Sequence, residues 1–228
     1  MIPKAIPQKH PEEPPLVGSS AASLVAKTLR DEIIRGEFKE DERLRQDHLA
    51  VRFGVSQMIV REAFKQLVHE GFLQAEPRRG VAVSRLSQDD VVELTHVRSL
   101  IEAQALAWAI PKMTAHDLEE AARVLKELER AETADGVINL NKAFHRQLYA
   151  PCARPRTLAL VATMQGAFER YFYFIYSKTK HVPKTQREHH AILKLCRDRN
   201  VDAACDLLKE HIMGAGEALT NHLARFEK

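Results

Sequence analysis

Apolar residues recur every three or four positions through the second half of the chain, which is the period of an α-helix with one buried face. Six such segments follow one another, at roughly 88–110, 114–132, 136–150, 154–179, 184–199 and 201–225. Proline and glycine separate several of them, as expected at breaks between helices: Pro111, Gly136, Pro151, Pro155 and Pro183. Residues 86–228 are therefore expected to form an all-helical bundle of six or so helices.

Residues 1–85 carry a different pattern, in which short helical segments give way to alternation. Residues 1–18 hold five prolines and few large apolar side chains, so a disordered tail is expected there. Helical periodicity runs from Ser19 or Ser20 to Gly36, then over 43–53 and 56–69. Segments 72–75 and 81–84 alternate like two strands around a turn at 76–80. Residues 19–85 are thus expected to form a winged helix-turn-helix, and the whole chain to be mainly α.

The segment from Leu49 to Leu67 has the spacing of a helix, a turn and a second helix that can enter a DNA groove. Gly54 closes the turn, and Ser56 is placed to cap the second helix. Basic side chains gather around that helix and the turn after it, where phosphate contacts would form. The residues expected to contact double-stranded DNA are Arg52, Ser56, Gln57, Met58, Arg61, Lys65, Arg78, Arg79 and Gly80.

Composition excludes some classes of protein but does not decide the function. The chain of 228 residues has a formal net charge of +3 and a pI near 8.7, which permit nucleic-acid binding without requiring it. No apolar run approaches the ~18 residues of a spanning helix, and the proline-rich N-terminus lacks the apolar core of a signal peptide. The three cysteines form no Cys-x-x-Cys pair, so we expect reduced, buried thiols in a cytoplasmic protein with no membrane partner.

The first half resembles the GntR superfamily of bacterial transcription regulators over about residues 20 to 85. The motifs that carry the resemblance are Gly36, Leu49-Ala50, Gly54-Val55-Ser56, Val60-Arg61-Glu62-Ala63 and Glu70-Gly71. The resemblance implies an operator-binding protein that acts as a homodimer, because two half-sites about one DNA turn apart give small reading heads their affinity.

The helical half is similar to the FCD effector domain of the FadR-like branch of that superfamily. Its anchors are Arg98-x-x-Ile101-Glu102, Phe144-His145, Glu188-His189 and His211. The resemblance implies that residues 86–228 bind an effector and carry the dimer contacts. It also implies a small carboxylate as the effector, bound beside a metal ion.

Two departures from the superfamily pattern lie in the first half. Glu40-Asp41 replaces a frequent Pro-Gly, so the turn before the second helix is expected to be built differently. Gln57 replaces an arginine that reads a guanine edge in the related branch. Because a glutamine amide both donates and accepts at the major-groove edge, Gln57 suits adenine better than guanine. The operator is therefore expected to differ from that of the branch.

Asn141 and His145 are four residues apart, so both side chains lie on one helix face, in a pattern that resembles the Asp-x-x-x-His ligand pair of the family. His189 and His211 also fall on apolar stripes and point inward, whereas His190 aligns with charged residues. The set Asn141, His145, His189 and His211 is expected to bind a divalent metal ion, with zinc, nickel and manganese all suitable. Asparagine brings no charge, which weakens the site. The alternative is that each histidine is a hydrogen-bonded core residue.

Arg98 falls on the apolar stripe of the first bundle helix, where a guanidinium needs an anion. Glu102, four residues on, could supply that anion in a purely structural pair. The resemblance implies instead that Arg98 clamps the carboxylate of the effector. Tyr149 lies next to the His145 face, and Tyr171 belongs to an aromatic run expected to line either a pocket or a subunit interface. The expected effector-binding residues are thus Arg98, Glu102, Tyr149 and Tyr171.

The function expected from these observations is sequence-specific transcription regulation under the control of a small carboxylate. One alternative is a constitutive dimeric DNA-binding protein without an effector, which would leave the inward polar set unexplained. Another is a metal-dependent helical-bundle enzyme. Beyond Glu102, no carboxylate falls on an inward stripe beside the histidines to serve as acid or base, so no enzymatic activity is expected.

Overall fold

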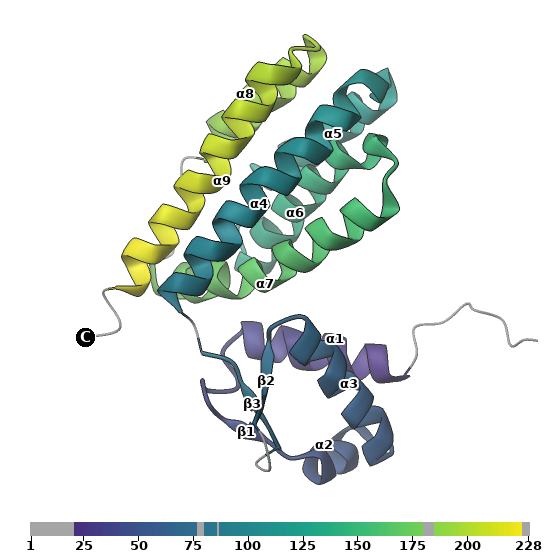
Figure 1. Cartoon of the computed structure of the whole chain (residues 1–228), viewed down its shortest axis with the longest axis vertical. Helices are drawn as coiled ribbons and strands as arrows, with labels where there is room; N and C mark the ends of the chain where they lie inside the picture. The colour runs from purple at the N-terminus through teal and green to yellow at the C-terminus, as the bar shows by residue number, and fades with distance from the viewer. Residues whose placement is uncertain (1–20, 77–79, 86, 180–184, 225–228) are drawn as a thin grey trace, which may run out of the picture.

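The computed structural model describes residues 21–76, 80–85, 87–179 and 185–224, which form a small head and a larger helical bundle. Figure 1 shows the head below the bundle, joined to it by the segment that leads into the helix α4. The expectation of a disordered tail at residues 1–18 lies outside the described residues and stays a prediction.

The head contains three helices and a three-stranded antiparallel sheet. Its elements are α1 (Ala21–Ile34), β1 (Arg43–Leu44), α2 (Gln46–Phe53), α3 (Gln57–His69), β2 (Leu73–Glu76) and β3 (Gly80–Val83). The strand order is β1-β3-β2, with Leu44 opposite Val81 and Leu73 opposite Val83. This is the winged helix-turn-helix expected for residues 19–85.

The start of the second helix was predicted too early. Residues 43–53 were expected to be helical, but Arg43 and Leu44 form strand β1, and the helix begins at Gln46. Pairing with β3 explains the difference, because the Asp41 N–H donates to the carbonyl of Val83 and Val83 donates in turn to the carbonyl of Glu42. Asp41 lies in the left-handed region (φ +59°) and turns the chain into the sheet, where the family pattern has Pro-Gly.

The described residues of the bundle form six α-helices and two short 3-10 helices. These are α4 (Gln88–Ala109), η1 (Ile110–Lys112), α5 (Ala115–Leu128), α6 (Ala134–Tyr149), η2 (Ala150–Cys152), α7 (Pro155–Thr179), α8 (Thr185–Arg197) and α9 (Val201–Leu223). Each helix agrees with one of the six periodic segments of the sequence. Among the described helices, none combines the length and hydropathy needed to cross a membrane.

Each part has its own apolar core. In the head, Leu29, Phe64 and Leu67 are buried between α1 and α3. In the bundle, Leu106 and Leu125 belong to a larger core that also contains the three cysteines, which are buried and free as expected. A third, smaller cluster lies where α4, α7 and α9 approach one another, and its members are Val91, Phe168, Tyr171, Leu219 and Leu223.

The head and the bundle meet along α7, which lies at the end of the bundle that faces α1 in Figure 1. Arg170 of α7 is buried and donates a hydrogen bond to the carbonyl oxygen of Ser84, in the segment between β3 and α4. Tyr171 donates its hydroxyl hydrogen to Asp90 in the first turn of α4. Helix α7 therefore connects the junction with the head to the interior of the bundle.

Candidate functional site

Helix α3 presents one face to the head core and the opposite face outward. Val60 and Phe64 are buried on the inner face. Ser56 caps the helix by accepting a hydrogen bond from the N–H of Ile59 at 3.4 Å, as expected from the sequence. The remaining DNA-contact candidates of this helix are exposed: Gln57, Met58 (65% exposed), Arg61 and Lys65. The N-terminal half of α3 thus offers polar, apolar and basic groups to a groove.

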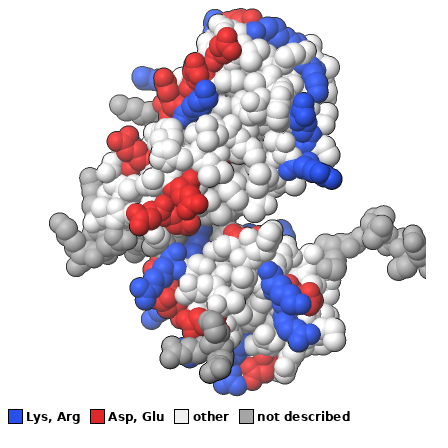
Figure 2. Space-filling model, in the orientation of Figure 1, with Lys and Arg blue, Asp and Glu red and all other residues white. Residues whose placement is uncertain are grey.

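The other DNA-contact candidates differ in availability. Arg52 donates two hydrogen bonds to Glu32 of α1, so part of its guanidinium is used to hold α2 against α1. Gly80 opens β3 with a φ of +92°, a conformation that favours glycine at the end of the wing turn. Arg78 and Arg79 lie outside the described residues. On the face drawn in Figure 2, basic and acidic side chains are interspersed over the head.

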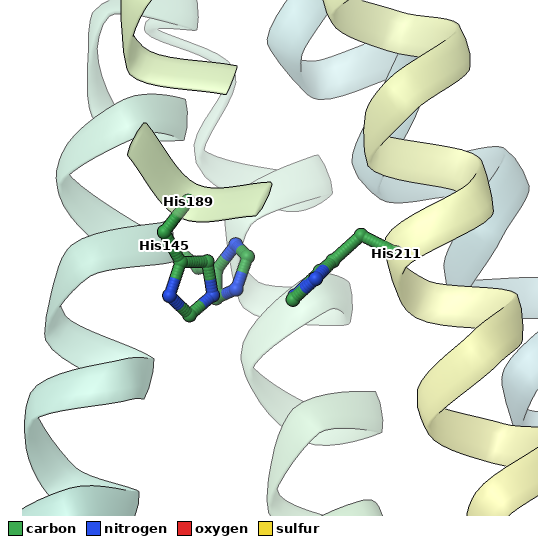
Figure 3. A group of neighbouring side chains, drawn as sticks. All are labelled: His145, His189 and His211. Atoms are coloured by element: carbon green, nitrogen blue, oxygen red, sulfur yellow. The ribbon is translucent and has the colours of Figure 1, made fainter. Parts of the chain in front are cut away.

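Three buried histidines from three helices converge in the bundle (Figure 3). His145 lies on α6, His189 on α8 and His211 on α9, and one potential ligand atom from each lies within 4.8 Å of the other two. Their ring centroids are 4.7 to 5.3 Å apart. His190 is exposed and lies 2.6 Å from Glu129, which confirms that it faces away from this cluster.

On two of the histidines, hydrogen bonds determine which ring nitrogen carries no proton. Tyr149 donates to the buried carboxylate of Glu102 at 2.9 Å, so its oxygen accepts from Nδ1–H of His145 at 3.1 Å. Likewise, Nδ1 of His211 lies 2.7 Å from Glu188 Oε2 and donates to that carboxylate. Both rings therefore keep Nε2 as an unprotonated nitrogen, in the way that metal-binding histidines are oriented by a second partner.

His189 has no such partner. Both of its ring nitrogens are buried, and neither has a hydrogen-bond partner among the described residues. A buried polar atom without a partner costs about 1–3 kcal/mol, so proteins rarely leave one without a reason. Burial and the neighbouring His211 lower the pKa of His189 to about 2. His189 is thus a neutral ring with a lone pair available inside the cluster.

Burial also lowers the pKa of the other two histidines. The pKa of His145 falls well below its ordinary value, because burial and the nearby His189 and His211 all disfavour the charged ring. Burial lowers the pKa of His211 as well, although Glu188 opposes the shift. All three rings are therefore neutral at physiological pH, which is the form that binds metal ions.

Glu102 organises the floor of the site. Its side chain is fully buried and accepts hydrogen bonds from Arg98 Nε at 2.7 Å, from Tyr149 and from Gln165 Nε2 at 2.9 Å. The guanidinium of Arg98 also stacks on Phe168, with its carbon 4.3 Å from the ring centroid. The structural pair considered for Arg98 and Glu102 is therefore present, and it holds Arg98 in a defined orientation.

A cavity of about 60 Å³ opens beside the cluster, which is several times the roughly 10–15 Å³ that one water needs. Arg98, Asn141, His145 and His211 all line it, so the structure brings four of the eight predicted metal and effector residues to one cavity. Its described lining also includes polar and apolar side chains from the helices α5 to α9, among them Lys142, Gln165, Phe168, Glu169, Phe172, Gln186 and Ile212.

Comparisons with known families cover both parts of the chain. Residues 21–83 match the family described as bacterial regulatory proteins, gntR family, and residues 93–214 match the FCD domain. The first match spans α1 to β3, and the second spans most of the bundle, including the three histidines. The chain belongs to the GntR family and carries an FCD domain. It is a DNA-binding transcription regulator, as the sequence motifs predicted.

Relatives of this GntR-family chain resemble it over four fifths or more of its length. The HTH-type transcriptional regulator YdhC of Bacillus subtilis is 29% identical over 189 residues, which cover 81% of this chain and 83% of YdhC. A crystal structure of a GntR family member from Pseudomonas syringae is 32% identical with a TM-score of 0.59, over 95% of this chain and 90% of that one. McbR/YncC of E. coli shares the fold, with a TM-score of 0.77 at 21% identity over 90% of this chain and all of that one.

Three of the four predicted effector residues of this GntR-family protein, Glu102, Tyr149 and Tyr171, are not among the described residues that line the cavity. Tyr171 was predicted to bind the effector, but it lines a separate cavity of about 160 Å³ between the head and the bundle, together with Asp90 and Arg170. Phe168 and Glu169 of the same helix line the candidate site, whereas Tyr171 is not among its described lining residues. Tyr149 is fully buried behind His145 and acts on that ring rather than on the cavity.

Sequence reasoning also missed several residues of the cavity. Lys142, Gln165, Glu169 and Gln186 line it but were not proposed. The helical spacing held a signal for two of them, because Lys142 precedes His145 by three residues and Gln186 precedes His189 by three. Residues three apart share a helix face, so both lie one turn from the cluster on its own helices.

Proposed function

We propose that this GntR-family regulator binds its operator as a homodimer and that a small carboxylate, held with a divalent metal ion in the FCD-domain cavity, controls operator affinity. The observation that carries the proposal is the three-histidine cluster at the wall of a cavity lined by Arg98. No observation favours an enzymatic role, because both family matches are to regulator families.

The donor set fits a first-row metal ion. Three neutral imidazoles are the ligands that zinc and nickel prefer, and the amide oxygen of Asn141 is a harder donor beside them. A metal ion would give a partner to one of the two unpartnered nitrogens of His189. His145, His189 and His211 would hold the ion, with Asn141 as a weaker fourth donor. The bound ion would supply positive charge that attracts an anionic ligand.

The carboxylate assignment rests on charge. Arg98 lines the cavity and uses its Nε for Glu102, which leaves its terminal N–H groups for another partner. An arginine fork and a metal ion both favour a carboxylate over a neutral ligand. The cavity volume limits this ligand to a small molecule.

Metal content tests the cluster directly. We expect the full-length protein, dialysed and analysed by inductively coupled plasma mass spectrometry, to retain about one transition metal ion per chain. His189→Ala should lose most of it, and His145→Ala and His211→Ala should behave alike. The matched control is His190→Ala, which removes the exposed neighbouring imidazole and should leave the metal content unchanged. Equal metal content in His189→Ala and His190→Ala would contradict the proposed site.

Operator binding is tested with sheared genomic DNA from the source organism. We expect the protein to retain, at physiological salt, fragments that share a short palindrome, since two heads of a dimer read two half-sites. Sedimentation of the protein should give the mass of a dimer. Retention without a common motif would show that the head contacts phosphates only, and a monomer in sedimentation would contradict the palindromic operator.

A further inference from the structure

The proposed effector cavity has a second polar level, one helical turn away from the histidine cluster. It consists of Lys142 on α6, Glu169 on α7 and Gln186 on α8, which all line the same cavity. Lys142 and Gln186 each precede a cluster histidine by three residues. Glu169 lies four residues after Gln165, which donates a hydrogen bond to Glu102. One turn of helix is about 5.4 Å, which sets the separation of the two levels.

One buried oxygen at this second level lacks a hydrogen-bond donor. Gln186 Oε1 is buried without a hydrogen-bond partner among the described residues. Glu169 Oε1 lies 2.7 Å from Lys142 Nζ, so this carboxylate forms an ion pair with the ammonium. The Lys142 side chain is 39% exposed, and its ammonium has further N–H groups that can donate to another acceptor. The second level thus combines one acceptor that needs a donor with one donor that can serve an additional acceptor.

This mixture discriminates between the groups that a small acid could carry. A second carboxylate only accepts hydrogen bonds, so it would leave Gln186 Oε1 without a donor and would repel Glu169. An ammonium only donates and would lie near the ammonium of Lys142. A methyl group would leave Gln186 Oε1 unsatisfied. A hydroxyl group can donate to Gln186 Oε1 while it accepts from Lys142, so it satisfies both groups.

Resting on the proposed function, we propose that the effector is a short hydroxylated monocarboxylate, with its carboxylate at Arg98 and the histidine cluster and a hydroxyl at Lys142, Glu169 and Gln186. Val137 and Ile138, one further turn along α6, line the cavity with apolar side chains and offer the ligand no polar partner. The ligand therefore needs one polar group at each of two levels about 5 Å apart, a distance that a chain of about four carbons spans.

A matched four-carbon series tests this assignment by calorimetry on the full-length protein in buffer that contains Zn²⁺. The four probes are 4-hydroxybutanoate, butanoate, succinate and 4-aminobutanoate, which differ only in the group at the far end. We expect 4-hydroxybutanoate to bind about tenfold tighter than each of the other three, because unsatisfied buried polar groups strongly reject an isostere. Succinate or butanoate binding as tightly as 4-hydroxybutanoate would overturn the proposal.

Substitutions at the second level should change preference rather than abolish binding. Glu169→Gln removes the charge that repels a second carboxylate, so succinate should bind to this variant about tenfold tighter than to the native protein. Gln186→Leu should erase most of the preference for 4-hydroxybutanoate over butanoate. Glu120→Gln is the control, because it also breaks an ion pair, with Arg123 at 2.9 Å, but on the exposed face of α5. Unchanged preferences in both cavity variants would overturn the proposal.

Arg98→Ala separates failure of this inference from failure of the proposed function. If the four acids bind with similar affinity and Arg98→Ala abolishes their binding, the carboxylate site stands and the hydroxyl preference is wrong. If none of the acids binds, or if Arg98→Ala leaves their binding intact, the carboxylate site itself is contradicted and the hydroxyl preference falls with it.

Discussion

Gln57 is the first residue of the reading helix, and its side chain is exposed where α3 would enter a groove. A glutamine amide pairs with the N6 and N7 groups of adenine, whereas arginine pairs with O6 and N7 of guanine. Gln57→Arg should therefore shift the preferred base from adenine toward guanine at one position in each half-site. Selection of binding sites from a random DNA library, followed by sequencing, measures this shift.

The control for Gln57 is a residue that contributes charge without reading a base. Lys65 lies two turns further along α3, exposed and 2.9 Å from Glu62. Lys65→Met should weaken binding to all DNA sequences to a similar extent. It should also make DNA affinity less dependent on salt concentration, by the amount expected for the loss of about one phosphate contact. A motif that stays the same in Gln57→Arg, or one that moves in Lys65→Met, would contradict the assignment of Gln57 as the base-reading residue.

A site residue could be predicted from the sequence where a polar side chain falls on the otherwise apolar face of its helix. His145, His189 and His211 stood out because they fall on apolar stripes at the spacing that the resemblance to the FCD domain implies, and the structure brings all three together. Lys142 and Gln186 are only half-buried, so their positions in the sequence look like those of solvated residues. Their role depends on which helices surround them, and the spacing within one helix does not reveal that.

At the level of elements, α4 and α9 pack closely at the position of one small residue. Gly216 is buried on α9, and a methyl group there would lie 2.7 Å from Thr95 Cβ on α4. Thr95 cannot turn aside easily, because it is buried and its hydroxyl donates to the carbonyl of Val91. Gly216→Ala should lower the free energy of unfolding by about 1–3 kcal/mol, the usual range for overpacking. Urea unfolding followed by circular dichroism measures this change.

Gly214 provides the matched control on the same helix. It is exposed, and an added methyl group would meet no described atom within 4 Å. Gly214→Ala should leave stability unchanged or raise it by up to about 1 kcal/mol, because alanine favours the helix more than glycine does. If both variants had the same stability, helix propensity would account for the effect and close packing against Thr95 would not.

Elements with a periodic or alternating pattern could be predicted from the sequence, including the strands β2 and β3, whereas strand β1 could not. All six bundle helices span three turns or more, so the apolar period determines them well. Strand β1 contains only Arg43 and Leu44, too few residues to show any period, and it exists because β3 offers a free edge. Such an element is decided by a partner about 40 residues away in the sequence rather than by its own residues.

Across the whole molecule, α7 contacts both the proposed effector cavity and the junction with the head. Phe168 and Glu169 line the cavity. The next two residues, Arg170 and Tyr171, bond to Ser84 and Asp90 at the junction. Because these four residues span about one helical turn, a rotation or shift of α7 caused by a ligand would move the junction contacts as well. Helix α7 is thus suited to couple ligand binding to the orientation of the head.

Tyr171→Phe tests this coupling with little disturbance, because the ring stays in its apolar cluster while the hydrogen bond to Asp90 is lost. We expect the variant to bind the tightest acid of the four-carbon series with unchanged affinity. The ratio of operator affinities with and without the acid, measured by fluorescence anisotropy, should fall toward one from the roughly 5–150-fold range of typical allosteric coupling. Leu160→Ala, at an exposed position of the same helix, is the control and should keep the native ratio. Because coupling is reciprocal, operator binding must change the affinity for the acid by the same factor by which the acid changes operator affinity. A native ratio in Tyr171→Phe would show that the signal passes through other contacts.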